Sequence, residues 1–123
     1  MGRYYNGDIE GKFWFGIQSS NDADFFGVEG NYYHLEYYFD KEQLPDIKDG
    51  IKQCEAKLGK WRPKLDKFFD KNNGYNEDML EEQIKLQKSD SSKILSWYAR
   101  LILGLKIKNC VEKHGNCNFQ AEL

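Results

Sequence analysis

The spacing of the apolar side chains changes near residue 40, and this change constrains the fold more than any other feature. Residues 10–18 and 32–39 alternate apolar and polar side chains, which is typical of strands with one buried face. After residue 40 the apolar residues take helical spacing, beginning with Ile47, Ile51, Cys54 and Leu58. We therefore expect an α+β fold, with an N-terminal antiparallel β-sheet followed by a C-terminal helical half.

The chain has 123 residues, which suits a single domain with one core. We expect that domain to span residues 1–123, strand-rich over 1–40 and helical over 41–123. The two alternating segments should pair antiparallel, and a short strand at residues 4–6 should add an edge to the sheet. Between them, "SSNDADFFGVEG" predicts a helical turn with Phe25 and Phe26 inward and solvent-exposed aspartates.

Local signals set the helix boundaries. Pro45 predicts the start of the first helix and Gly59 its end, and Pro63 predicts the start of a second. Asn76 is a candidate N-cap for a third helix, which the polar segment "KSDSS" at residues 88–92 either breaks or continues as an exposed turn.

The charges and the cysteines exclude several classes of protein. Lysine and arginine number 18 and aspartate and glutamate 20, a net charge of −2, so we expect no nucleic acid polymer as partner. No apolar run reaches the roughly 20 residues of a membrane span and no signal segment is present, which predicts no membrane partner and a cytoplasmic location. Cys54, Cys110 and Cys117 lack paired spacing and should be reduced thiols.

The segment "ILSWYARLILGL" at residues 94–105 leaves almost no polar stripe at helical spacing. It predicts a long, nearly all-apolar helix that is buried on all sides. A fold of this size favours burial by a partner subunit, so we expect a homo-oligomer, a dimer or larger, with this helix at the interface. The alternative is a central helix wrapped by the sheet and the other helices of its own chain.

Arg100 lies inside this apolar segment, in a row of polar positions that includes Lys93 and Lys108. A buried guanidinium needs a partner, because a dry unpaired charge costs several kcal/mol. The partner is either a ligand phosphate, which the planar fork of arginine suits, or an aspartate or glutamate on a neighbouring element.

Lys12 and Trp14 form a second candidate site, on the face of the first strand opposite Phe13 and Phe15. An aromatic ring that stacks a base beside a cation that meets phosphate is the usual division of labour in nucleotide sites. Aromatic residues at strand spacing also often belong to the core, and the sequence leaves both interpretations open.

Metal binding and catalysis have weaker signals. Cys110, His114 and Cys117 lack the second ligand pair that a zinc site needs, so we expect no metal and no cofactor. His34 and Glu36 share one strand face, but no nucleophile motif accompanies them. We expect a protein that is not an enzyme.

The opening "RYYNGDIEGKFWFGIQSS", the aromatic second strand and the helical half around "SWYARLILGL" resemble the phage Thoeris anti-defence 1 family. These proteins are sponges that sequester immune signals of the cyclic ADP-ribose type. The resemblance implies an oligomer that binds a cyclic nucleotide at subunit boundaries without cleaving it. It further implies that adenine stacks on Trp14, Trp97 or Tyr98, and that the phosphates meet Arg100 and a lysine.

A second hypothesis is a small phage inhibitor that contacts a defence protein directly. The segment "EGNYYHLEYYFDKE" at residues 29–42 would supply an exposed aromatic and acidic patch for a basic partner.

Overall fold

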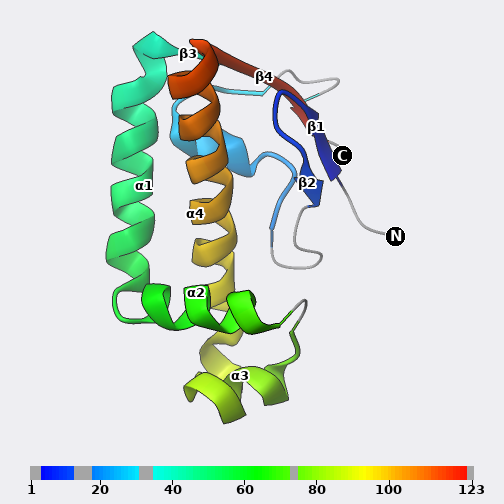
Figure 1. Ribbon diagram of the computed structural model, residues 1–123, viewed down its shortest axis with the longest axis vertical. Helices are drawn as coiled ribbons and strands as arrows, with labels where there is room; N and C mark the ends of the chain where they lie inside the picture. The colour runs from blue at the N-terminus through cyan, green and yellow to red at the C-terminus, as the bar shows by residue number, and fades with distance from the viewer. Residues whose placement is uncertain (1–3, 13–17, 31–34, 73–74, 122–123) are drawn as a thin grey trace.

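The computed structural model describes residues 4–12, 18–30, 35–72 and 75–121, and shows an α+β architecture (Figure 1). The strands are β1 (Tyr4–Gly7), β2 (Gly11–Lys12), β3 (Glu36–Asp40) and β4 (Asn116–Ala121). The α-helices are α1 (Leu44–Leu58), α2 (Trp61–Lys71), α3 (Glu77–Ile84) and α4 (Lys88–His114). Two short 3-10 helices, η1 (Asp22–Phe26) and η2 (Lys41–Gln43), complete the described elements.

The described strands form one antiparallel sheet in the order β2-β1-β4-β3. The C-terminal strand β4 therefore lies inside the sheet, and the expectation that residues 41–123 are all helical was wrong. β4 was missed although it alternates buried Cys117, Phe119 and Ala121 with exposed neighbours, because the six-residue strand directly follows a long helix.

Two expectations about strand pairing were also wrong. β1 is not an edge, since it pairs with β2 on one side and with β4 on the other. Gly11 and Lys12 pair with β1, whereas β3 pairs with β4, so these described parts of the two alternating segments do not pair directly. Residues 13–17 and 31–34, which hold the rest of both segments, lie outside the described residues.

The first helix begins and ends where the sequence predicts. Asp40 and Gln43 form a reciprocal capping box immediately before α1, and Pro45 occupies its first turn. Ile47, Ile51, Cys54 and Leu58 are all buried, as their spacing predicts, and Gly59 follows the last residue of the helix.

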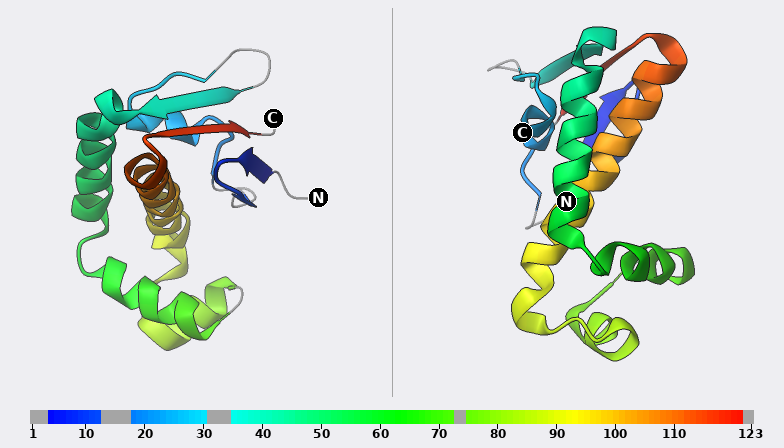
Figure 2. Two further views of the ribbon diagram at one scale, coloured as in Figure 1. Left: turned by 45° about the horizontal axis from the view of Figure 1, so that its top comes forward. Right: turned by 90° about the vertical axis from the view of Figure 1, so that its left-hand side faces the viewer.

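The core lies between the two long helices and one face of the sheet. α1 and α4 lie side by side, and the sheet packs against α4 on the side away from α1. α2 and α3 lie together at the end of the molecule away from the sheet (Figures 1 and 2). Tyr37, Phe39 and Phe119 stack on the inner face of the sheet, with ring centroids of Tyr37 and Phe119 5.2 Å apart. The strands thus supply a flat aromatic layer against which the helices pack.

α4 is long, but it is not a nearly all-apolar helix. It extends over 27 residues and carries lysines, Arg100 and other polar residues between its buried positions. Its apolar residues are covered within the same chain, since α4 packs against α1, α2, α3, η1 and the sheet, and Leu101 and Leu103 are almost fully buried. This is the arrangement of a central helix, so the burial of these leucines does not require a partner subunit.

The third helix is capped as expected, because the Asn76 side chain accepts a hydrogen bond from the Met79 N–H. The break before α4 falls at residues 85–87, where Lys85 takes a left-handed conformation, and "KSDSS" forms the first turn and a half of α4. Among the described residues, no helix combines the length and the apolar character needed to cross a membrane.

Candidate functional site

Arg100 in the middle of α4 reaches across to η1 and meets Asp22. The guanidinium Nε donates to Asp22 Oδ1 at 2.7 Å, and the Gln18 amide donates to the other carboxylate oxygen at 2.9 Å. Asp22 is 5% exposed, so the prediction that the aspartates of this turn are solvated was wrong for Asp22. The internal ion pair that the sequence allowed as an alternative is therefore present.

Two aromatic rings hold the Arg100 guanidinium. Its central carbon lies 4.6 Å from the Phe25 ring centroid and 4.8 Å from that of Trp97, both at cation–π distance. The two rings touch each other edge to face, with centroids 5.8 Å apart. Lys57 of α1 brings a second cation to within 5.9 Å of the Trp97 ring. We name Arg100, Asp22, Phe25, Trp97 and Lys57 the arginine cluster.

Two glycines within helices allow η1 to approach this closely. A Cβ atom on Gly104 of α4 would lie 2.4 Å from the Phe26 ring, and one on Gly50 of α1 would lie 2.7 Å from it. Phe26 is fully buried between these helices. Phe26 belongs to the same short 3-10 helix as Phe25 and Asp22. Its close packing therefore also brings these two residues against Arg100 of α4.

A second aspartate of η1 fixes the turn to the sheet. Asp24 Oδ1 accepts hydrogen bonds from the Tyr37 hydroxyl at 2.5 Å and from the Gly30 N–H at 3.0 Å. Burial, followed by the hydrogen bond to Asp24, raises the pKa of Tyr37, so its hydroxyl remains a donor. η1 is therefore held to α1 and α4 on one side and to β3 on the other.

The arginine cluster presents a positioned hydrogen-bond donor. Arg100 is 28% exposed, and among the described residues its only hydrogen bond is made by Nε. No described residue accepts a hydrogen bond from the two terminal amino groups of the fork, and the rings and Asp22 fix the plane in which these groups lie. A guanidinium in this setting suits a two-pronged contact with a phosphate or carboxylate.

Cys54 of α1 lies near the charges of this cluster and is fully buried. Burial is the main cause that raises the pKa of its thiol to about 12, and the nearby Arg100 charge lowers it only in part. The thiol is therefore protonated at neutral pH, and it behaves as a small apolar side chain.

The structure brings only some of the expected ligand-binding residues together. Trp97 joins Arg100, but Tyr98 faces α2, where it donates to Asp66 at 2.7 Å and stacks on Phe69, and it is 4% exposed. Its ring is thus part of the core and does not offer a face to a ligand.

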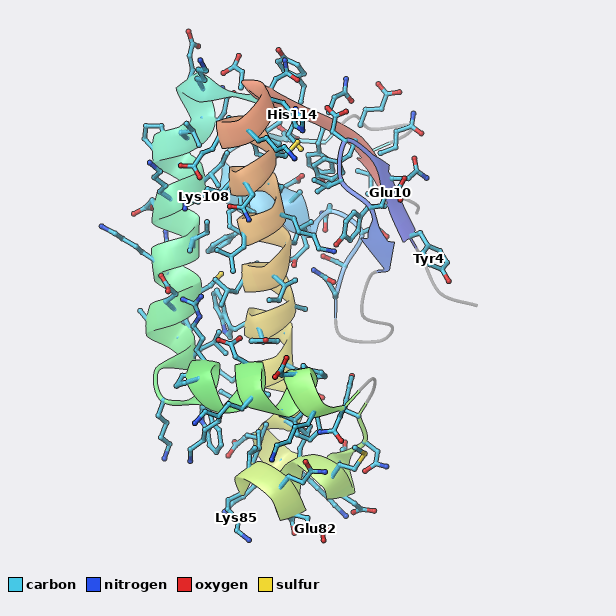
Figure 3. The ribbon with its side chains drawn as sticks, viewed as in Figure 1. Tyr4, Glu10, Glu82, Lys85, Lys108 and His114 are labelled. Atoms are coloured by element: carbon cyan, nitrogen blue, oxygen red, sulfur yellow. The ribbon has the colours of Figure 1, made fainter. Side chains whose placement is uncertain are left out.

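The expected lysines lie apart from Arg100. Lys93 is exposed roughly two helical turns before Arg100. Lys108 lies roughly two turns after it and pairs with Glu112 at 3.5 Å (Figure 3). Trp14 and the side chain of Lys12 lie outside the described residues.

The residues considered for metal binding and catalysis show structural contacts. The Cys110 thiol donates to the Asn116 carbonyl at 3.5 Å, and Cys117 is fully buried in β4. Burial raises the pKa of the Cys117 thiol. No group of three or more histidine, cysteine, aspartate or glutamate side chains in the described segments is arranged to hold a metal ion. His34 lies outside the described residues.

Sequence reasoning missed three members of the arginine cluster: Asp22, Phe25 and Lys57. They come from η1 and α1, far from Arg100 in the sequence. One signal was present, since glycines inside two helical patterns, at positions 50 and 104, indicate that another segment approaches closely.

Comparison of the chain with protein-family models, with curated proteins and with solved structures finds no match.

Proposed function

We propose that this protein is a non-catalytic binding protein that sequesters a cyclic nucleotide signal of the cyclic ADP-ribose type. The observation that carries the proposal is the Arg100 fork, which lies against two aromatic rings and whose terminal amino groups donate to no described residue. A ligand phosphate would accept two hydrogen bonds from this fork, and Lys57 would add a second positive charge close by.

Preorganisation supports binding over turnover. Asp22 and the two rings fix the guanidinium before any ligand arrives, so little side-chain freedom is lost when an anion binds. Tight binding of a ground state does not lower a reaction barrier, which suits a protein that retains its ligand intact.

The biological part of the proposal rests on the resemblance to the Thoeris anti-defence 1 family. Withdrawal of a cyclic nucleotide immune signal from the host cytosol would counter an anti-phage defence. The proposal includes a dimer or larger assembly, and the partly exposed Ile102 and Leu105 of α4 are where a second copy would gain apolar contact.

The test is native mass spectrometry of the protein purified from cells that make such signals, followed by heat release of bound small molecules. Arg100→Lys keeps the charge but removes the fork, whereas Arg62→Lys makes the same change at an arginine of α2 that pairs with Glu55 of α1 and Asp66 of α2. We expect wild type and Arg62→Lys to carry an intact nucleotide and Arg100→Lys to carry much less.

Other outcomes would contradict the proposal. Arg100→Lys that carries as much nucleotide as wild type would remove the Arg100 fork from the site. Wild type that carries no nucleotide would reject sequestration, and a released fragment in place of an intact ligand would indicate an enzyme.

A second candidate function is inhibition of a defence protein by direct contact. The outer face of the sheet favours it, because Tyr38 is 52% exposed and Tyr4 is 48% exposed, and Glu36 lies on the same face of β3 as Tyr38. Figure 3 shows Tyr4 at the side of the sheet, away from the helices. In this case Tyr38→Ser abolishes inhibition in cells while Arg100→Lys leaves it unchanged.

A further inference from the structure

A hollow of about 560 Å³ lies between α2 and α3, at the end of the molecule opposite β4. α2 lines it with Lys64, Lys67 and Lys71, which follow one another at spacings of three and four and so share a helix face. Lys85, the left-handed residue directly after α3, also belongs to the lining. Figure 3 shows Lys85 at this end of the molecule.

The four lysines are exposed, and the Lys64 ammonium lies over the Trp61 ring, 5.0 Å from its centroid. None of them makes an ion pair with a described residue, and Asp70 is the one acidic residue among the described residues that line the hollow. The chain carries a net charge of −2, so the positive charge is a local feature and does not follow from composition. Like charges at these spacings destabilise a helix, and a bound counter-charge would relieve the repulsion between them.

The lining is not only charged. Phe68, which is 2% exposed, and the half-buried Ile84 supply apolar surface, and Gln83 supplies an amide. Gln83 already accepts a hydrogen bond from the Asn72 amide at 3.2 Å, which ties the end of α2 to α3. The walls of the hollow are thus joined by a direct contact.

We propose that this hollow, the α2–α3 groove, is a binding site for the oligophosphate group of a small phosphorylated molecule. Its volume falls within the roughly 300–1,000 Å³ range of small-molecule sites. The lining lysines carry charge opposite to that of a chain of phosphates, and their flexible stems allow the ammonium groups to reach several of its oxygens. A concave site of this size favours a small ligand over the flat surface of a protein partner.

The inference does not depend on the proposed function. The α2–α3 groove shares no residue with the arginine cluster, whose members come from η1, α1 and the middle of α4. Either site can therefore be present without the other, and variants in one test it separately.

The experiment is calorimetric titration at low ionic strength, with sodium tripolyphosphate as probe of the phosphate part and ATP as probe of a complete nucleotide. Lys67→Gln/Lys71→Gln removes two charges from the groove. Lys48→Gln/Lys52→Gln is the matched control, because it removes two exposed lysines of equal spacing from α1. Circular dichroism verifies that each variant is folded.

We expect tripolyphosphate to bind, the groove variant to weaken its binding about tenfold, and the control to change it less than about twofold. Asp70→Asn should strengthen binding, since it removes the carboxylate from the lining. Arg100→Lys should leave binding unchanged. Absence of binding overturns the inference. Equal losses of affinity in the groove variant and the control would also overturn it, because they would indicate diffuse attraction to surface charge. A loss of affinity confined to Arg100→Lys would overturn it as well.

Discussion

Arg100 on α4 and Asp22 on η1 lie 78 residues apart in the sequence, yet their Nε and Oδ1 atoms are 2.7 Å apart. This pair ties the turn between the strands to the central helix. It also sets the plane of the guanidinium, so the pair stabilises the fold and positions the donors that the proposed function needs.

Asp22→Asn tests the structural part of that relationship. The change leaves a partly buried guanidinium without a counter-charge, which should lower the free energy of unfolding by about 1–3 kcal/mol. Urea denaturation followed by circular dichroism measures it. Asp49→Asn, at an exposed position of α1, is the control and should cost much less. Equal losses in the two variants would show that the Arg100 pair contributes no more than a surface carboxylate.

Gly104→Ala tests the close approach of η1 to α4. Alanine in the middle of a helix normally stabilises it by about 1 kcal/mol relative to glycine. Here the new Cβ would lie 2.4 Å from the Phe26 ring, so we expect a net loss of about 1–3 kcal/mol from overpacking. Phe26→Leu, which removes the ring, should destabilise the wild type more than it destabilises Gly104→Ala. A higher melting temperature for Gly104→Ala would show that the ring moves aside freely.

Leu101→Glu separates burial within the chain from burial at an interface. Leu101 is fully buried by its own chain, so a glutamate there should abolish the folded state and not merely dissociate an assembly. Leu105→Glu, at a partly exposed position one turn later, should retain the helical circular dichroism spectrum. Light scattering after gel filtration gives the mass of each variant. A folded monomer from Leu101→Glu would place that residue at a subunit interface.

The raised pKa of Cys54 predicts a dependence of stability on pH. The folded-state value of about 12 lies above the ordinary value near 9, so between these pH values the native chain holds a proton that the unfolded chain releases. The contribution of this proton to the free energy of unfolding is fully present below pH 9. It is lost as pH rises toward 12, by up to about 1.4 kcal/mol per pH unit. Cys54→Ala should therefore show a shallower loss of stability over that range in denaturation curves at stepped pH. If the free energy of unfolding falls equally with pH in wild type and Cys54→Ala, the raised pKa of Cys54 is contradicted.

Local signals were enough to predict where α1 begins and ends and where α3 begins. The proline near the start of α1, the glycine after it and the asparagine before α3 each act on their own helix terminus. The Arg100 to Asp22 pair could not be predicted in this way, because it depends on how η1 packs between two helices. The sequence predicted that Arg100 would have a partner, but it did not show which one.

The groove and the sheet illustrate the same limit. The spacing of Lys64, Lys67 and Lys71 is visible in the sequence, but the presence of Lys85 in the same lining depends on how α3 packs against α2. Likewise, the alternation in β4 is visible, but its place between β1 and β3 is a matter of long-range pairing. Such contacts are set by the tertiary structure and leave little trace in any single segment.

The central position of β4 also has a consequence for biosynthesis. β1 and β3 do not pair with each other, because each pairs with β4, which residues 116–121 form between them. During translation the helices can form while that strand is still inside the ribosome, but the sheet cannot close. Closure of the sheet should therefore be a late step, because its central strand is synthesised after the two strands that it joins.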